Sequence, residues 1–557
     1  MTVRNILLLF LYFHSSLGDL ASVVWNGANK TYDVKDSIVP DAIAWANFTD
    51  QIHKIGWSYL EVSTNGSYPD KMQAYAAGIV EGYLTYQLIY KHWINTVEGY
   101  CNDEAEYCAK LKNYLAINSD WMKKQIALSH GNDPYWHQVN LILAQLNGLE
   151  EGYRKHTAEV RARRDTSFWS NEDVLGFIMV QISGDLEDLE VVLKKTVSHR
   201  RRVFGGGSCS ALVKVLPNGE EIFVSQDSWS TYQSMLRILK KYNFQYHVTA
   251  AKDSALIPAQ TMTFSSYPAS LTSGDDFYCT SSGLVTMETT IGNSNPDLWK
   301  YVTPEGGVLE WIRSMVANRL SADGETWTKF LSQYNSGTYN NQWMVVDMKL
   351  FKPGKPLKAD LLWVLEQLPK YVMRADKTDL LRDQLYWPSY NVPYFPFIYN
   401  MSGSAAAAAK HGDWFSYDKT PRALIFKRDQ PNVSSLETMM KLMRYNDYTH
   451  DPLSRCNCTP PYSAENAISA RCDLNPKNGT YPIAALGHRS HGGIDMKLTS
   501  SKLFSSGLSF VAIGGPSYDS LPPFQWSRSD FETDTPHMGQ PDLWKFDPII
   551  FDGEAEL

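Results

Sequence analysis

The chain has 557 residues, of which 43% are hydrophobic and 20% charged, which is typical of one large folded unit and excludes a disordered chain. Its 17 Trp, 32 Tyr and 22 Phe predict an aromatic-rich core or a broad apolar cleft. The formal net charge of −8 offers no basic surface, so nucleic-acid binding is not expected.

The first 18 residues have the pattern of a secretory signal peptide. Arg4 supplies the positive start, residues 6–13 form the apolar stretch, and small residues lead up to Gly18. A membrane anchor is the alternative, but the apolar stretch is far shorter than the roughly 20 residues that span a bilayer. The sequence therefore predicts cleavage after Gly18, and no later transmembrane segment is expected.

Seven Asn-x-Ser/Thr sequons agree with a secretory route. They are predicted to carry glycans and to lie mostly on the surface, at Asn29, Asn47, Asn65, Asn400, Asn432, Asn457 and Asn478.

Residues 36–165 are predicted to be mostly helical, because apolar residues recur there at helical spacing. The pattern Gly-x-x-x-Gly-Tyr occurs at residues 78–83 and again at 148–153. Either these are paired helices whose glycines permit close backbone approach, or the repetition is coincidental. Glu81 and Glu151 within them are candidates for a carboxylate pair, although solvated or capping roles are commoner for glutamate.

Residues 166–208 change in character. A helix entry at 168–173 is followed by an acidic stretch at 185–190, basic residues at 199–202 and three glycines at 205–207. Such a segment is predicted to be an exposed linker that is trimmed after cleavage, with a simple solvated loop as the competing interpretation.

A β-hairpin is predicted directly after these glycines. Apolar and polar residues alternate from Cys209, and Asn218-Gly219 is the strongest short signal for a two-residue type I′ turn. A second strand then runs from residue 221 to about 228.

The predicted register places Cys209 opposite Ser228 and Ala211 opposite Gln226. Polar side chains would therefore lie on the same face as the cysteine. Cys209 is either a buried structural cysteine or a nucleophile that becomes a chain terminus when the Ser208–Cys209 bond is cut.

The rest of the chain mixes strand and helix patterns, which is typical of layered α+β packing. Strands are predicted at 213–216, 222–224, 261–265, 284–290, 343–348 and 423–426. Helices are predicted at about 229–242, 308–319, 360–368 and 434–444, and the polyalanine run at 405–409 favours a helix.

Seven cysteines are an odd number, which in a secreted chain suggests one unpaired thiol, and Cys209 is assigned to it. Cys101 and Cys108 are predicted to form a local disulfide. One more disulfide is expected among Cys456, Cys458 and Cys472, while the partner of Cys279 stays open. A zinc site at Cys456-x-Cys458 is the disfavoured alternative, because the compartment is oxidising and no matching ligand pair is near.

Several ordered blocks of the sequence match one family. They lie at 209–216, 225–229, 235–237, 267–268, 275–278, 287–290, 338–343, 388–393, 421–423, 428–430 and 443–446. In these blocks the chain resembles the phospholipase B-like family of lysosomal glycoproteins, which belongs to the N-terminal nucleophile hydrolases. The resemblance spans nearly all of the mature chain. It implies an α+β fold, an αββα four-layer sandwich with an N-terminal helical segment.

The resemblance also implies roles for individual residues. Asn391 and Arg422 match active-site positions, where their side chains would donate to a developing oxyanion, and Trp229 and Thr290 match pocket positions. From the residues alone, the ordinary interpretation of Asn391 is a turn asparagine before a proline, and that of Arg422 is a surface arginine. The chain departs from the family at Gln226, where a histidine is usual, and a glutamine cannot titrate.

Cys209 could act without a separate histidine. At a new N-terminus its α-amine, with a reference pKa of about 7.7–8.0, can accept the proton of the thiol. In the precursor the same thiol could attack the Ser208 carbonyl and cut the chain.

Other motifs are weaker. Residues 206–210 lack the final glycine of a Gly-x-Ser-x-Gly elbow. His488, His491 and Asp495 would suit a metal or a triad, although isolated histidines are the commoner interpretation. No nucleotide fingerprint is present.

We therefore expect a signal peptide (1–18), an N-terminal, mostly helical chain (19–208) and a nucleophile-bearing chain (209–557), the latter two packed as one unit. The expected function is a self-cleaving lysosomal or secreted hydrolase of acyl ester or amide bonds, with phospholipid deacylation implied by the resemblance. It would need no cofactor and no metal and would take a small-molecule acyl substrate. The alternative is a non-catalytic glycoprotein or lipid-binding protein that keeps the fold. The sequence leaves the oligomeric state open.

Overall fold

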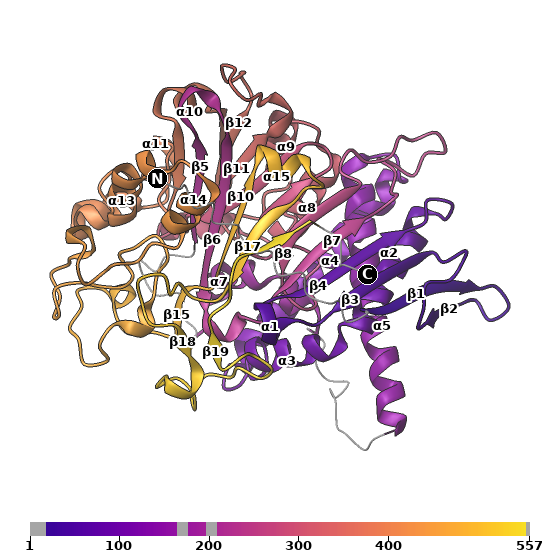
Figure 1. Cartoon of the computed structure of the whole chain (residues 1–557). Coiled ribbons are helices and arrows are strands. Elements are labelled where there is room, and N and C mark those ends of the chain that lie inside the picture. Colours follow the sequence, from indigo (N-terminus) through magenta and orange to yellow (C-terminus); the bar gives the residue numbers. More distant parts are fainter. Residues whose placement is uncertain (1–17, 164–175, 197–208, 553–557) are drawn as a thin grey trace, which may run out of the picture.

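The computed structural model describes residues 18–163, 176–196 and 209–552, in which helices are combined with two large β-sheets (Figure 1). The larger sheet has 11 strands in the order β13 (Tyr371–Asp376), β12 (Leu362–Leu368), β11 (Asn341–Asp347), β10 (Leu284–Thr290), β9 (Phe277–Thr280), β8 (Thr261–Ser266), β7 (Ile238–Asn243), β4 (Ser58–Thr64), β3 (Ala44–Thr49), β1 (Asp19–Asn26) and β2 (Thr31–Lys35).

The smaller sheet contains the predicted hairpin. Its strands run in the order β14 (Tyr386–Ser389), β5 (Cys209–Val215), β6 (Ile222–Thr231), β16 (Asp495–Ser500), β17 (Phe510–Gly514) and β20 (Ile549–Phe551), and β15 (His491–Gly493) also pairs with β6. One apolar cluster joins the two sheets, with Val213 and Val224 from the smaller sheet and Met287 and Val346 from the larger. The inner faces of both sheets are therefore buried against each other.

Helices pack on the outer faces. The apolar cluster on the larger sheet includes residues of α2 (Asp70–Leu84), α4 (Ala105–Ser129), α5 (Pro134–Arg163), α7 (Ser183–Val192), α8 (Glu310–Leu320) and α9 (Gly324–Ser332). The cluster on the smaller sheet includes residues of α13 (Pro421–Asp429) and α14 (Leu436–Met443). Figure 1 shows α13 and α14 on one side of the molecule and α5 with β1 and β2 on the opposite side.

The remaining α-helices and strands of the described chain are α1 (Ile52–Ile55), α3 (Tyr86–Thr96), α6 (Ile178–Gln181), α10 (Thr378–Gln384), α11 (Pro396–Met401), α12 (Ser404–His411), α15 (Ser501–Ser505), β18 (Phe524–Gln525) and β19 (Leu543–Trp544). Among the described residues, no helix is both long and apolar enough to cross a bilayer.

The two glycine motifs bring the backbones of α2 and α5 into contact. A Cβ atom on Gly78 or Gly82 of α2 would overlap carbonyl oxygens of α5, and one on Gly148 or Gly152 of α5 would overlap carbonyl oxygens of α2. The prediction of paired helices is therefore confirmed, and glycine is required because the two backbones touch.

The two glutamates of these motifs do not pair with each other. Glu81 is buried and accepts from Lys240 Nζ (2.7 Å) and from the Tyr242 hydroxyl (2.6 Å). Glu151 lies nearer the surface, where it contacts Lys155 and Tyr75. Both have structural partners, so the carboxylate-pair interpretation is wrong.

The strands β4 and β7 lie parallel and join the two halves of the chain within one sheet. Their register pairs Ser58 with Ile238 and Ser63 with Asn243. The N-terminal part of the chain thus contributes four strands, β1 to β4, to the larger sheet.

The prediction of a mostly helical region at 36–165 is confirmed, because α1 to α5 occupy most of it, although β3 and β4 precede its long helices. Three other predicted elements are wrong. Residues 229–242 and 360–368 are largely strand where helices were predicted, because β7 and β12 are covered on both faces, which hides the strand period. Residues 423–426 lie in α13, a helix that opens with Pro421 in its first turn.

The cysteine predictions are met in part. Disulfides link Cys101 with Cys108 and Cys456 with Cys458. Three thiols in the described chain remain free, not one, namely Cys209, Cys279 and Cys472.

Of the seven sequon asparagines, five are exposed, and Asn47 and Asn65 are half-buried. The predicted exposed linker at 166–208 is wrong for its described part, because residues 176–196 include α6 and α7, whose Met179, Leu186 and Leu189 are buried in the core. The rest of that segment, with the helix entry at 168–173, and residues 1–17 of the predicted signal lie outside the described residues.

Candidate active site

The β5–β6 hairpin has the predicted register. Cys209 pairs with Ser228 and Ala211 pairs with Gln226. The turn residues Asn218 and Gly219 both have positive φ, 60° and 66°, as a type I′ turn requires. The strand alternation and the turn together place Cys209 at the first position of β5 with its side chain on the face that meets the larger sheet.

Cys209 is held by its backbone on both sides while its thiol stays free. Its nitrogen donates to Asn391 Oδ1 (3.4 Å), and its carbonyl oxygen accepts from Arg422 (2.6 Å). The residue is only 5% exposed. A fixed backbone with a free sulfur is what a positioned nucleophile needs.

The Cys209 thiol is protonated in this arrangement. Burial, with the neighbouring Glu288 carboxyl adding to it, raises the pKa of the thiol well above its usual range. The Lys497 ammonium and the backbone N–H of Trp229, which donates to the sulfur, act in the opposite direction. A base is therefore required before the sulfur can attack a carbonyl.

Asn391 follows β14 and adopts a positive φ of 68°. The side-chain atom that faces Cys209 must be its oxygen, because it lies 2.8 Å from the guanidinium of Arg422, which can only donate. The Asn391 nitrogen donates instead to the carbonyl oxygen of Thr290 (2.7 Å). The expected donor role at an oxyanion thus differs from this geometry, in which Asn391 presents an acceptor to the Cys209 nitrogen.

Arg422 is the second residue of α13 and is buried, so it is not the surface arginine of the ordinary interpretation. Its guanidinium donates to Cys209, to Ser210 Oγ (3.3 Å) and to Asn391. It also lies 4.4 Å from the ring of Trp229. Burial lowers the pKa of Arg422 to about 10, so the group stays charged at neutral pH.

The remaining predicted pocket residues surround this centre. Trp229 is buried, and its Nε1 donates to the carbonyl of Ile468 (3.2 Å). Thr290 contributes its carbonyl to Asn391, as described above. Gln226 is fully buried and donates from Nε2 to the carbonyls of Asp275 (2.6 Å) and Glu288 (2.7 Å). It therefore ties the smaller sheet to the larger one.

A buried ionic network lies beside Ser228, the residue opposite Cys209. Asp275 accepts from Arg237 (2.6 Å), Lys497 (2.7 Å) and Ser228 Oγ (3.0 Å). Asp495 accepts from the same two cations, at 2.6 Å and 2.7 Å. Burial alone would raise the pKa of Asp275, but the two cations hold this pKa well below its usual range.

Sequence patterns did not predict this network. The one available signal was the pair of opposite charges, Asp495 and Lys497, at alternate positions of an otherwise apolar stretch.

One group of side chains in the described chain has donor atoms close enough to share a metal ion. The ligand atoms of Glu465, Cys472 and His491 all lie within 4.8 Å of one another. Arg489, however, donates to Glu465 (2.8 Å) and lies 3.5 Å from the Cys472 sulfur. The guanidinium already supplies the positive charge there, so we assign no metal.

The predicted partners His488 and Asp495 are not part of that group. His488 contacts Asp530 (3.0 Å), and Asp495 belongs to the ionic network. The triad interpretation is therefore wrong.

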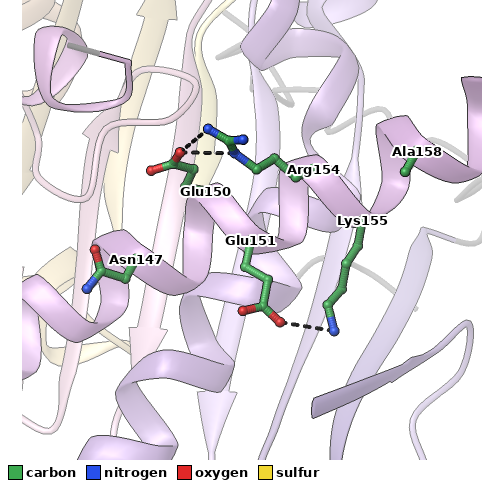
Figure 2. A pocket seen from close by; sticks show the side chains of 6 residues that line it. All are labelled: Asn147, Glu150, Glu151, Arg154, Lys155 and Ala158. Carbon is green, nitrogen blue, oxygen red and sulfur yellow. Dashed lines mark hydrogen bonds and ion pairs between the residues drawn. The ribbon is translucent and has the colours of Figure 1, made fainter. Parts of the chain in front are cut away.

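Figure 2 shows a separate hollow along one face of α5. Two ion pairs, Glu150 with Arg154 and Glu151 with Lys155, lie along it. Charged pairs four residues apart are typical of a solvated helix face, and none of the residues predicted around Cys209 lines this hollow.

Comparisons with known proteins give a consistent result. The model of the family described as Phospholipase B matches residues 44–551. A mouse phospholipase B-like 2 protein is 52% identical over 533 residues, which cover 95% of this chain and 88% of the mouse protein. Phospholipase B-like protein B of Dictyostelium discoideum is 38% identical, covering 92% of this chain and 86% of that protein.

Among solved structures, a mutant of the conjugated bile acid hydrolase from Clostridium perfringens is 10% identical. It matches 61% of this chain and 97% of its own with a TM-score of 0.30.

Proposed function

The chain belongs to the phospholipase B family, and on that premise we propose that it is a self-cleaving hydrolase of acyl ester or amide bonds with Cys209 as its N-terminal nucleophile. The observation that carries this proposal is the pair of contacts on the Cys209 backbone. Asn391 Oδ1 already accepts from the Cys209 nitrogen, so after a cut between Ser208 and Cys209 the same oxygen would hold the new α-amine.

In the first step the Cys209 sulfur attacks the Ser208 carbonyl. The Ser208–Cys209 C–N bond breaks, a thioester to sulfur forms, and the thiol proton passes to the departing nitrogen. Water then hydrolyses the thioester, which leaves a carboxyl group on Ser208 and a free thiol and amine on Cys209. Ser208 lies outside the described residues, so the contacts of Cys209 alone support this step.

In the second reaction the α-amine takes the thiol proton and the sulfur attacks the acyl carbonyl of the substrate. The alcohol or amine of the substrate leaves with that proton, and water releases the acyl group from the thioester. The buried Arg422 guanidinium, which donates to the Cys209 carbonyl, keeps positive charge beside the developing oxyanion. The substrate class, phospholipid or another acyl compound, follows from the family name alone.

The proposal extends to fold and location. A four-layer αββα arrangement is supported by one apolar cluster between the sheets and by a helix-bearing cluster on each outer face. The proposal also includes a signal peptide that is cleaved after Gly18 and glycans on the sequon asparagines. It places the protein in the lysosome or outside the cell.

The test is a comparison of wild type with Cys209→Ala. Wild-type protein should give two fragments, the larger beginning Cys-Ser-Ala-Leu on N-terminal sequencing, while Cys209→Ala should stay whole. Cys279→Ala is the matched control, because Cys279 is also a free buried thiol but lies outside the site. Normal processing of Cys209→Ala would overturn self-cleavage.

Gln226 favours one alternative, a non-catalytic protein that keeps the fold. Its amide donates to two backbone carbonyls and neither gains nor loses a charge near neutral pH. The absence of any Cys209-dependent turnover by cut protein on phospholipids and N-acyl amides would leave this alternative standing.

A further inference from the structure

The segment from residue 176 to residue 196 is bound firmly to the larger sheet. Ile182, Leu186 and Leu189 are buried in the helix-side cluster. Asp188 accepts from the backbone nitrogen of Tyr339 (2.9 Å), and Gln181 donates to the carbonyl of Ala269 (2.6 Å). Apolar contacts and hydrogen bonds therefore hold this segment on the sheet.

Besides Asp188, four more carboxyl groups are buried beneath and beside α7. We call Asp185, Asp276, Glu288 and Glu310 the acid cluster; each is at most 1% exposed. They come from four different elements: α7, the turn before β9, β10 and the first turn of α8. Asp185 links two of these elements directly, because it accepts from the backbone nitrogen of Glu310 (3.3 Å).

The acid cluster lacks partners for its charge. Asp276 Oδ2, Glu288 Oε2 and Glu310 Oε1 are buried oxygens without a hydrogen bond. Within residues 18–163, 176–196 and 209–552, none of the four side chains forms a salt bridge. A buried ionised carboxylate in that position costs several kcal/mol, which protonation removes.

The groups that face the cluster do not neutralise it. Arg313 of α8 faces Glu310 and Asp185, but it donates to the carbonyls of Val308 (2.9 Å) and Leu331 (2.6 Å) and to Gln367 (2.9 Å). Lys497 of β16 faces Glu288 and is paired with Asp275 and Asp495. Tyr339 and Tyr278 of the sheet and Tyr114 of α4 are neutral phenols. Asp275 adds negative charge but is paired within its own network, and at the far end of α7 Glu190 is paired with Lys195.

This environment favours the protonated, neutral form of the four carboxyl groups. Burial raises the pKa of Asp185 to about 6. Burial and the neighbouring Asp275 raise the pKa of Asp276 to about 8, and burial and Asp276 raise the pKa values of Glu288 and Glu310 well above their usual range.

We propose that the acid cluster is a pH-dependent latch, which holds residues 176–196 on the larger sheet in acid and weakens as the pH approaches neutrality. Between the ordinary carboxyl pKa of about 4 and the raised values, the docked state keeps protons that the released state gives up. Docking is therefore strongest at low pH and is lost progressively as the pH rises.

The latch adjoins the Cys209 site. The Tyr339 hydroxyl lies 3.2 Å from both Glu288 Oε1 and the carbonyl oxygen of Gly274, either of which can accept its one proton. Gln226, on the face of Cys209, donates to the carbonyls of Asp275 and Glu288. Release of α7 would thus loosen the strands that support the site, although the latch itself does not depend on Cys209 being a nucleophile.

The test is hydrogen exchange measured by mass spectrometry on full-length Cys209→Ala, at about pH 5 and about pH 7.5, with correction for intrinsic exchange rates. Peptides within 176–196 should exchange at least about tenfold faster at the higher pH, while peptides of β1, at the far end of the larger sheet, serve as the internal reference. The readout is local protection, so its failure is distinct from a failure of the catalytic proposal.

Variants separate the cluster from a general pH effect. Asp276→Asn with Glu310→Gln keeps the side-chain shapes but removes two charges, and the difference between the two pH values should shrink to less than about threefold. If the double variant fails to fold, Asp185→Asn alone should reduce the difference in exchange between the two pH values in part. Glu106→Gln, at an exposed site on α4, should leave the tenfold difference in place. Equal protection at both pH values, or an unchanged response in Asp276→Asn with Glu310→Gln, would overturn the latch.

Discussion

The Oδ1 atom of Asn391 lies 3.4 Å from the backbone nitrogen of Cys209, across 182 residues of chain. In the continuous chain that nitrogen is an amide with one proton to donate. After a cut it would be an amine, and the asparagine oxygen would fix the orientation of its lone pair relative to the thiol. The contact therefore connects the uncut state with the proposed catalyst.

Replacing Asn391 tests that contact. Asn391→Ala should slow self-cleavage about ten- to a hundredfold, the cost of one or two hydrogen bonds to a group that carries charge during the reaction. Asn391→Asp should lose less, because it keeps an oxygen acceptor and tolerates the positive φ. The measurement is the time course of fragment formation on denaturing gels after synthesis. Equal rates for alanine and aspartate would mean that the oxygen has no role.

The thiol of uncut chains should react slowly. Because burial raises the pKa of Cys209, the folded uncut protein holds less thiolate near pH 8 than an unfolded chain does, and iodoacetamide should label it at least about tenfold more slowly. Mass spectrometry can read this on peptides that span the Ser208–Cys209 bond. Labelling in denaturant gives the reference rate, and labelling as fast in the native protein as in denaturant would contradict the burial argument.

Gln226→His restores the residue that is usual in the family. A neutral histidine has one N–H, whereas Gln226 donates to two carbonyls, so one carbonyl loses its partner at neutral pH. We expect a loss of about 1–3 kcal/mol in the free energy of unfolding at neutral pH, a smaller loss in acid, and no gain in turnover beyond about threefold. Denaturant unfolding and an acyl hydrolysis assay measure the two effects. A large gain in rate would instead identify a missing proton shuttle.

The α2–α5 contact predicts a strong effect at Gly152. Gly152→Ala would place a methyl group against the carbonyl of Ile79, and the helices would have to separate. We expect a loss of about 1–3 kcal/mol or more in the free energy of unfolding. Gly27→Ala is the matched control, because Gly27 is exposed and an added Cβ meets only the Trp25 indole, 3.9 Å away. Thermal unfolding of both variants gives the comparison, and equal stability would show that the helix pair adapts.

Local patterns were sufficient for the hairpin. Alternation and the Asn218-Gly219 turn determine which residue lies opposite Cys209, because both signals depend only on near neighbours. The helix pair was likewise predictable from its glycines. Residues that meet from distant parts of the chain were not, since Arg422 reaches Cys209 across 213 residues and was found only through the family resemblance.

Buried charges explain most of the remaining errors. Lys240 lies inside β7 because Glu81 neutralises it, and a lysine at that position made the segment look half-solvated. The ionic network around Asp275 was missed for the same reason: a charged residue in a sequence suggests surface until its partner is known. Fold class is therefore readable from the sequence, whereas the polar interior of the molecule is not.

The parallel pairing of β4 with β7 means that a cut before Cys209 cannot release either fragment, because both contribute strands to one sheet. The cut molecule would behave as two chains in a permanent complex. Unfolding of the intact chain involves one molecule, whereas unfolding of the cut protein would also separate its two fragments. Refolding would then require the two fragments to meet in dilute solution. If the chain is cut as proposed, the mature protein would keep its fold only as long as it is never fully unfolded.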